Sequence, residues 1–438
     1  MEKTNFFLNI KENTLILNYE NVIIYLLAAL LCTIPLTFAF GSIASIAFLI
    51  FTIFSYKKLR FSTNFALALP ILLYLLMIFS ILWTNNVNDT LSALKKEVLF
   101  LLMPIAFLFL PKPNQSQINR VFTIYSWSMV IYAVYYTSRA SFRFLETGKS
   151  KFFFFHELVS TDLSAIYMAV FMSFGLFYFI SKEVISKYER GAILMLILFI
   201  LLLSSKSIIF IDIILSVCYY IYLSKTNKSI KMLTLVTVGF FLIFSLVYIN
   251  KIRHRFLVEY ETAFVDNNVN MEIGNQENKV YNISLSQAWN AKHFEPNNFF
   301  PGTALRIFQI RIFKEMLQEQ DIFFTGFGLG NAQDQIRQKV KKYNLYPGNG
   351  EFNFHNQYVQ TFAEIGVFGF ITLVIMMVYT VKKAFKNKDF MHIVFSLTMI
   401  MLFLTDSFLS RQRGIIFFIT LYCIFHTKTE INRQNKKL

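Results

Sequence analysis

His355 is the residue of this sequence best placed to carry out chemistry. It stands in the run NFHNQYVQTFAEIGVFGF, where a long polar stretch ends and an apolar segment begins. A neutral imidazole at such a boundary can accept a proton from a hydroxyl group near pH 7. A histidine that only marks a membrane interface is the alternative interpretation. No second histidine or carboxylate stands at a metal-ligand spacing, so no metal site is predicted.

Three basic residues are candidates for binding an anion. Arg306 and Arg311 are five positions apart on one expected helix, so their side chains project about 140° apart and should have different targets. A guanidinium fits phosphate oxygens in two-pronged fashion, although arginines near a membrane are also commonly solvated. Lys206, in LLLSSKSIIF, separates two apolar runs, where an unpaired cation is costly. A turn whose lysine reaches lipid headgroups is the other interpretation of Lys206.

A glycine-rich segment, Gly326-Phe327-Gly328-Leu329-Gly330, follows the expected helix. Such glycines can cradle phosphate, but no Lys-Ser/Thr follows them and no strand precedes them. A helix stop is the simpler interpretation. Asp212 and Asp406 are single acids within apolar runs and are expected to be packing partners.

The composition requires these residues to be held by membrane helices. Of the 438 residues, 55% are hydrophobic and only 16% are charged, aromatics make up 18%, and the mean hydropathy is +0.49. Soluble domains usually carry about a quarter charged residues. A soluble enzyme, a disordered chain and a disulfide-built module are therefore excluded. Cys32, Cys218 and Cys423 lie in apolar runs and are interpreted as small buried side chains.

A transmembrane helix needs about 20 largely apolar residues. The hydropathy pattern predicts twelve spans, or eleven if two short neighbours are one, at 21–40, 42–56, 65–83, 98–110, 121–138, 163–181, 192–204, 207–223, 232–249, 357–380, 390–410 and 414–427. The first twenty residues contain Lys3 and Lys11 and precede no small-residue cleavage site, so we expect no signal peptide.

Basic residues set the expected orientation. If the N-terminus is cytoplasmic, the cytoplasmic segments hold 21 basic and 7 acidic residues, or +14 of the formal net charge of +16. The long loop from residue 250 to 354 holds 12 basic and 11 acidic residues. This asymmetry predicts that both termini are cytoplasmic and that the loop faces the other side of the membrane.

The long loop is too long for a plain connection. In residues 303–320, Leu305, Phe308, Ile312 and Met316 recur at helical spacing, which predicts an amphipathic helix with Thr303 as N-cap, along the membrane interface or against the bundle. A polar helix over 331–343 and a turn at 347–350 should follow. We expect three regions: an N-terminal bundle (1–249), an extracytoplasmic loop (250–356) that forms a lid or site, and C-terminal spans with a basic tail (357–438).

Taken together, these motifs resemble the O-antigen ligase/polymerase family of membrane glycosyltransferases. His355-Asn356, followed after nine residues by Gly366-Val367-Phe368-Gly369, resembles the family's His-Asn…Gly-x-x-Gly signature. Arg306 with Gly326-Phe327-Gly328 resembles its Arg…Gly-x-Gly stretch, with Arg311 in reserve. Ser205-Lys206 resembles its Ser-Arg, with lysine in place of arginine. Glu364 is a further resembling position.

The resemblance implies an all-α polytopic membrane protein of the GT-C class, in the bacterial inner membrane, with a periplasmic active site under the large loop between spans 9 and 10. The implied donor is a glycan on undecaprenyl diphosphate, transferred en bloc without cofactor or metal. The acceptor would be lipid A-core in a ligase, which we favour, or a lipid-linked repeat unit in a polymerase. In this interpretation His355 and Arg306 are catalytic. Arg306, Lys206 and Arg311 bind the diphosphate, and the supporting residues are Asn356, Glu364, Gly326, Gly328, Gly366 and Gly369.

Two other functions remain open at this point. Twelve spans also suit a transporter of lipid-linked oligosaccharides, but no internal repeat is visible and coupling acids are scarce. A protein O-oligosaccharyltransferase shares the same class of motif.

Overall fold

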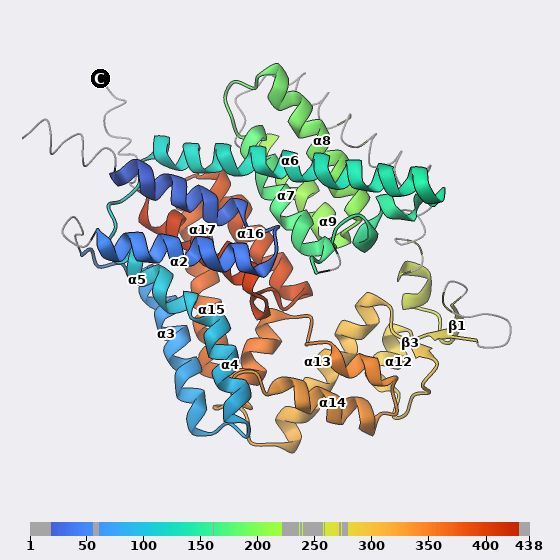
Figure 1. The fold of residues 1–438 in the computed structure, drawn as a ribbon. Helices are drawn as coiled ribbons and strands as arrows, with labels where there is room; N and C mark the ends of the chain where they lie inside the picture. The colour runs from blue at the N-terminus through green and yellow to red at the C-terminus, as the bar shows by residue number, and fades with distance from the viewer. Residues whose placement is uncertain are drawn as a thin grey trace, which may run out of the picture.

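The structure is a computed structural model that describes residues 19–55, 61–160, 162–220, 259–270 and 279–428, with the isolated positions 236, 239, 257 and 273. Its regular structure is nearly all α-helical (Figure 1). The elements before the long loop are a helix at Tyr19–Cys32, α2 (Phe38–Phe54), α3 (Phe65–Phe79), η2 (Ser80–Leu82), α4 (Val87–Glu97), α5 (Leu99–Phe109), α6 (Gln115–Thr147), η3 (Ser150–Phe153), η4 (Phe155–Glu157), α7 (Ala165–Ile180), α8 (Lys187–Leu203) and α9 (Lys206–Cys218).

The long loop adds three short strands and several helices, and the C-terminal part adds helices. A small sheet has the order β1-β2-β3, with β1 antiparallel to β2 and β2 parallel to β3. The elements are β1 (Asn268–Val269), β2 (Tyr281–Asn282), α12 (Leu285–Asn290), β3 (Asn298–Phe299), α13 (Gly302–Glu319), α14 (Ala332–Lys342), η6 (Pro347–Glu351), α15 (Gln357–Lys386), α16 (Phe390–Thr405), η7 (Phe408–Ser410) and α17 (Gln412–Thr427).

Where the structure describes them, the predicted apolar spans lie mostly in helices. The boundary between the first two spans was wrong: the break lies at residues 33–37, and α2 begins at Phe38. The span at 232–249 lies outside the described residues. By length and composition, α15 and the continuous helix Phe65–Leu82 are able to cross a membrane, and four other described helices are apolar but shorter. On α15, Phe368, Ile371, Ile375 and Val378 form an exposed apolar stripe. A contiguous apolar face of this kind suits lipid better than water, as expected of a membrane protein.

Two hydrophobic cores hold the described chain together. The larger lies in the helical bundle, where α15 packs on α3 and α16. The smaller lies within the loop and includes Phe294, Phe300 and Phe308. In Figure 1 the α12–α14 region lies to one side of the bundle, and α15 connects the two.

The predicted helix over 303–320 is observed as α13, and the polar helix over 331–343 as α14. The buried stripe of α13, which includes Phe308, Ile312 and Met316, packs in the loop's own core. The predicted N-cap was wrong: Pro301 occupies that position, and the Thr303 hydroxyl donates to Glu259 instead, at 2.5 Å.

A backbone contact joins the glycine-rich segment to a break in α15. The N–H groups of Phe327 and Gly328 donate to the carbonyls of Ala363 (2.8 Å) and Glu364 (3.0 Å), and the Val367 N–H donates to Phe323 (2.9 Å). At the break, Gly366 has φ 70° and ψ −170°, a conformation that is essentially restricted to glycine.

We predict that Gly366→Ala destabilises the protein by about 2 kcal/mol or more, because an added Cβ would lie 2.1 Å from the Phe324 carbonyl oxygen in a backbone conformation unsuited to alanine. The matched control is Gly191→Ala on α8, where nothing lies within 4 Å of the added atom. This control should be neutral or stabilising by up to about 1 kcal/mol. Thermal denaturation in detergent measures both effects, and equal midpoints for the two variants would contradict the prediction.

Candidate active site

A polar cavity of about 570 Å³ lies where the loop meets the bundle. Its wall combines α4, the segment before α7, the glycine-rich segment, the start of α15 and the connection between α16 and α17. The lining residues that can ionise are Lys96, Glu97, His156, Tyr167, Glu351, His355, Glu364, Asp406 and Arg411. The volume and polarity suit a hydrophilic group such as a sugar.

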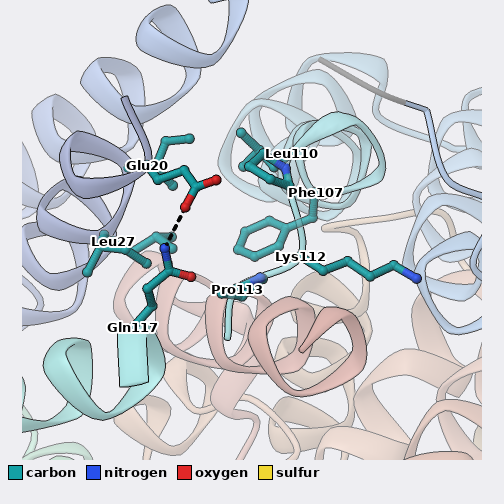
Figure 2. A pocket seen from close by; sticks show the side chains of 10 residues that line it. Glu20, Leu27, Phe107, Leu110, Lys112, Pro113 and Gln117 are labelled. Carbon is teal, nitrogen blue, oxygen red and sulfur yellow. Dashed lines mark hydrogen bonds between the residues drawn. The ribbon is translucent and has the colours of Figure 1, made fainter. Parts of the chain in front are cut away.

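A much smaller hollow, of about 20 Å³, shares no residue with this cavity. Figure 2 shows that Glu20 and Gln117 point toward each other there, and their side chains are hydrogen-bonded at 2.9 Å. Its volume does not admit a sugar ring.

His355 is held at the cavity by its neighbours. Asn356 is the N-cap of α15, accepting from the Val359 N–H at 3.1 Å and donating to the Leu404 carbonyl at 3.3 Å. His355 itself has φ 43°, an uncommon left-handed conformation for a non-glycine residue, and its N–H donates to the Asn353 side chain at 3.1 Å. The sequence motif His-Asn therefore couples a helix cap to an imidazole in a fixed orientation.

The imidazole of His355 is neutral at physiological pH. Burial, followed by the positive charges of Arg306 and Arg411, lowers the pKa of His355 from 6.5 to about 4. Its Nδ1 is buried and has no hydrogen-bond partner in the described part of the chain. His355 as a whole lines the cavity, and a neutral imidazole has one nitrogen that can accept a hydrogen bond from a bound hydroxyl group.

Arg306 projects from α13 toward the end of α16. Its Nε donates to the Thr405 carbonyl at 2.8 Å, and Nη1 donates to Gly302 at 2.9 Å. Burial lowers the pKa of Arg306, and the charges of Asp406 and Glu259 oppose this shift. Arg306 is not among the cavity-lining residues, but its charge acts on both His355 and Asp406, which line the wall.

Lys206, the first residue of α9, forms an ion pair with Glu259. The Glu259 carboxylate also accepts the Thr303 N–H at 2.6 Å. The pKa of Glu259 is lowered by Lys206 and Thr303 although burial opposes the shift. Lys206 does not line the cavity, and its ammonium group is engaged by a carboxylate.

Arg311 lies in a network inside the loop. It donates to the carboxylate of Glu315 at 3.0 Å, the Ala291 carbonyl at 2.7 Å and the Tyr343 hydroxyl at 2.9 Å. Lys339 joins the same network through Glu315 at 2.9 Å. These contacts give Arg311 a structural role, and Arg306 is the loop arginine whose charge reaches His355.

Glu364 lines the cavity and accepts from Gln360 Nε2 at 2.9 Å and from the Gly330 N–H at 3.3 Å. The candidate glycines serve close packing. An added Cβ at Gly326 would meet the Glu364 backbone at 2.5 Å, one at Gly328 would meet Thr84 at 2.6 Å, and one at Gly369 would meet Ile365 at 2.3 Å. Gly326 and Gly328 therefore let separate segments approach one another, and the contact at Gly326 fixes the backbone of Glu364. The contact at Gly369 lies within α15 itself.

Arg411, Glu97 and Lys96 also line the cavity, and none of them was predicted from the sequence. A signal for Arg411 was present, because arginine is disfavoured in a short connection on the predicted extracytoplasmic side. Asp406 was expected to be a packing partner, and it instead lines the cavity. Among the described residues, no group of three or more His, Cys, Asp or Glu side chains is arranged to hold a metal ion.

The described chain is all-α in its main elements, and its long and short apolar helices are consistent with a membrane protein. Residues 191–374 match the family model for O-antigen ligase. This match confirms the prediction from the motifs and supports the O-antigen ligase/polymerase family for this chain. None of the curated proteins matches the sequence.

We predict that His355 stays neutral well below the range of an ordinary histidine. The pKa of His355 is about 4 in the folded protein and lies below the unfolded value, so the unfolded state binds the proton more tightly. The free energy of unfolding therefore decreases as pH falls from about 6.5 to 4. Nitrogen-15 NMR of histidine-labelled protein in detergent measures the titration, with the signal assigned by its loss in His355→Gln. A midpoint near 6.5 would contradict the burial of this imidazole.

Proposed function

We propose that the protein is a membrane glycosyltransferase of the O-antigen ligase type. It transfers a polysaccharide en bloc from undecaprenyl diphosphate to lipid A-core, at the periplasmic face of the bacterial inner membrane. The observation that carries the proposal is the neutral imidazole of His355 in the wall of a sugar-sized cavity, within reach of the charge of Arg306, with both residues inside the family-matched range. The proposal includes a GT-C fold of about twelve spans with both termini cytoplasmic.

The proposed reaction is a displacement at the anomeric carbon. The acceptor hydroxyl oxygen forms a bond to this carbon, and the bond from the carbon to the phosphate oxygen breaks with its electron pair remaining on the diphosphate. His355 accepts a hydrogen bond from the hydroxyl and orients it, and the proton ends on the released diphosphate. The depressed pKa of His355 makes it a weak base and therefore favours this orienting role.

Arg306 stabilises the negative charge that develops on the departing diphosphate. A guanidinium held in advance by the Thr405 and Gly302 carbonyls loses little freedom on binding an anion. Its Nη2 has no hydrogen bond in the described part of the chain, and in this proposal Nη2 donates to a phosphate oxygen of the bound donor. In this proposal the cation does what a metal does in other transferases, and no metal is required.

We predict that His355→Gln and Arg306→Ala each reduce transfer by about 10²-fold or more. The assay uses purified protein in detergent with a glycan on undecaprenyl diphosphate and lipid A-core as acceptor. His293→Gln is the matched control, because His293 lies in the same loop, is exposed and does not line the cavity. Wild-type transfer by folded His355→Gln and Arg306→Ala variants would contradict the assignment.

The same experiment separates the alternative functions. Transfer in detergent, without a gradient, excludes transport as the primary activity. A polymerase would extend a lipid-linked repeat unit and leave lipid A-core unmodified. In a bacterial strain, loss of a ligase leaves long glycan on the lipid carrier, whereas loss of a polymerase leaves a single repeat on core.

A further inference from the structure

Arg411 lies in the wall of the cavity but outside the residues that match the family model. It is the N-cap residue of α17, at the end of the connection from α16. Its side chain is exposed, and its guanidinium lies over the Tyr167 ring at 5.9 Å. Among the described residues, neither an ion pair nor a hydrogen bond engages this guanidinium, so its donors are available to a ligand.

The neighbouring Arg413 makes the contrast clear. It donates to the carbonyl of Leu36 at 2.6 Å and to the Asp162 carboxylate at 2.7 Å, and it is nearly completely buried. Arg413 therefore fastens α17 to the bundle. Two arginines from the same short segment have different environments, and only Arg411 faces the cavity.

The connection that carries Arg411 is rigidly attached to the rest of the site. The Tyr167 hydroxyl donates to the Phe408 carbonyl at 3.0 Å, and the Leu409 N–H donates to the Gln357 side chain at 2.7 Å. At the other end, Arg306 donates to Thr405 at 2.8 Å. Arg306, Arg411 and the start of α15 are therefore held in one frame, which places two guanidinium groups around His355.

The distribution of charge decides where an anion can bind in this cavity. Glu97 and Glu364 line another part of its wall together with Lys96, so that part presents two acidic side chains and one basic side chain to a ligand. Lys206 is paired with Glu259 and lies outside the lining. The two arginines around His355, with Asp406 offsetting one charge, form the cationic part of the site.

We propose that Arg411 binds the diphosphate of the lipid-linked donor together with Arg306, and so takes the role that the family resemblance gives to Lys206. This inference rests on the proposed function and adds a residue to it. As the bond from the anomeric carbon to oxygen breaks, the electron pair passes to the diphosphate, and Arg411 compensates the resulting negative charge. Its planar fork provides two parallel donors, which an ammonium group lacks.

The test measures binding of undecaprenyl diphosphate without glycan to the full-length protein in detergent, by native mass spectrometry. We expect Arg411→Gln to weaken binding by about 10-fold or more, and Arg411→Lys to weaken it less, because lysine keeps the charge but loses the fork. Arg190→Gln, at an exposed arginine on α8 that is not part of the cavity lining, should bind as the wild type does.

The outcomes separate the two proposals. Wild-type binding by a folded Arg411→Gln protein overturns the role of Arg411 and leaves the proposed transfer standing. An equal loss in Arg190→Gln also overturns it, because the effect would then reflect overall charge. If the wild type binds undecaprenyl diphosphate but transfers no glycan, the proposed function fails while the assignment of Arg411 stands. Should Arg411→Gln not fold, the graded effect of Arg411→Lys on binding and on the donor KM decides the question.

Discussion

The backbone contact between the glycine-rich segment and the break in α15 is the constraint on which the site depends. It joins the loop, which has its own core, to a helix that packs in the bundle. The contact needs glycine at Gly366 because the chain adopts a conformation there that other residues avoid, and at Gly326 because two backbones approach closely. Once α15 is fixed in this way, its first turn fixes the orientation of His355, and α13 brings Arg306 to the end of α16. The glycine-rich segment, whose spacing resembles a phosphate-binding loop, is thus explained by close packing against the backbone of α15.

The cations around the cavity differ in what they contact, and this difference matters more than their number. Lys206 and Arg311 are engaged by carboxylates, so their charges are already compensated. Arg306 is oriented by carbonyl groups, which leave its formal charge uncompensated, and Asp406 supplies a partial counter-charge. The formal charge of +16 lies mostly in segments predicted to be cytoplasmic, so it bears on topology and not on anion binding.

The positions of helices could be predicted from the sequence, because a helix depends on residues that are close together along the chain. The helical period of Phe308, Ile312 and Met316 was strong enough to place α13, and the apolar runs placed the helices of the bundle. Thr303 failed as an N-cap because Glu259, 44 positions away, accepts its hydroxyl. The partners of Lys206 and the cavity position of Arg411 are likewise long-range facts. No spacing along the chain reveals them, because they arise only when distant helices pack together.

The charges at the site link binding of the donor diphosphate to orientation of the acceptor hydroxyl by His355. Burial and the charges of Arg306 and Arg411 together depress the pKa of His355. An anionic diphosphate bound by the same guanidinium groups would offset their effect on the imidazole, since opposite charges nearby favour the protonated form. In the proposed function, binding of the donor therefore makes His355 a stronger hydrogen-bond acceptor at the stage when the acceptor hydroxyl must be oriented. The empty site keeps a weakly basic imidazole, and the occupied site has a more basic one, without any movement of the backbone.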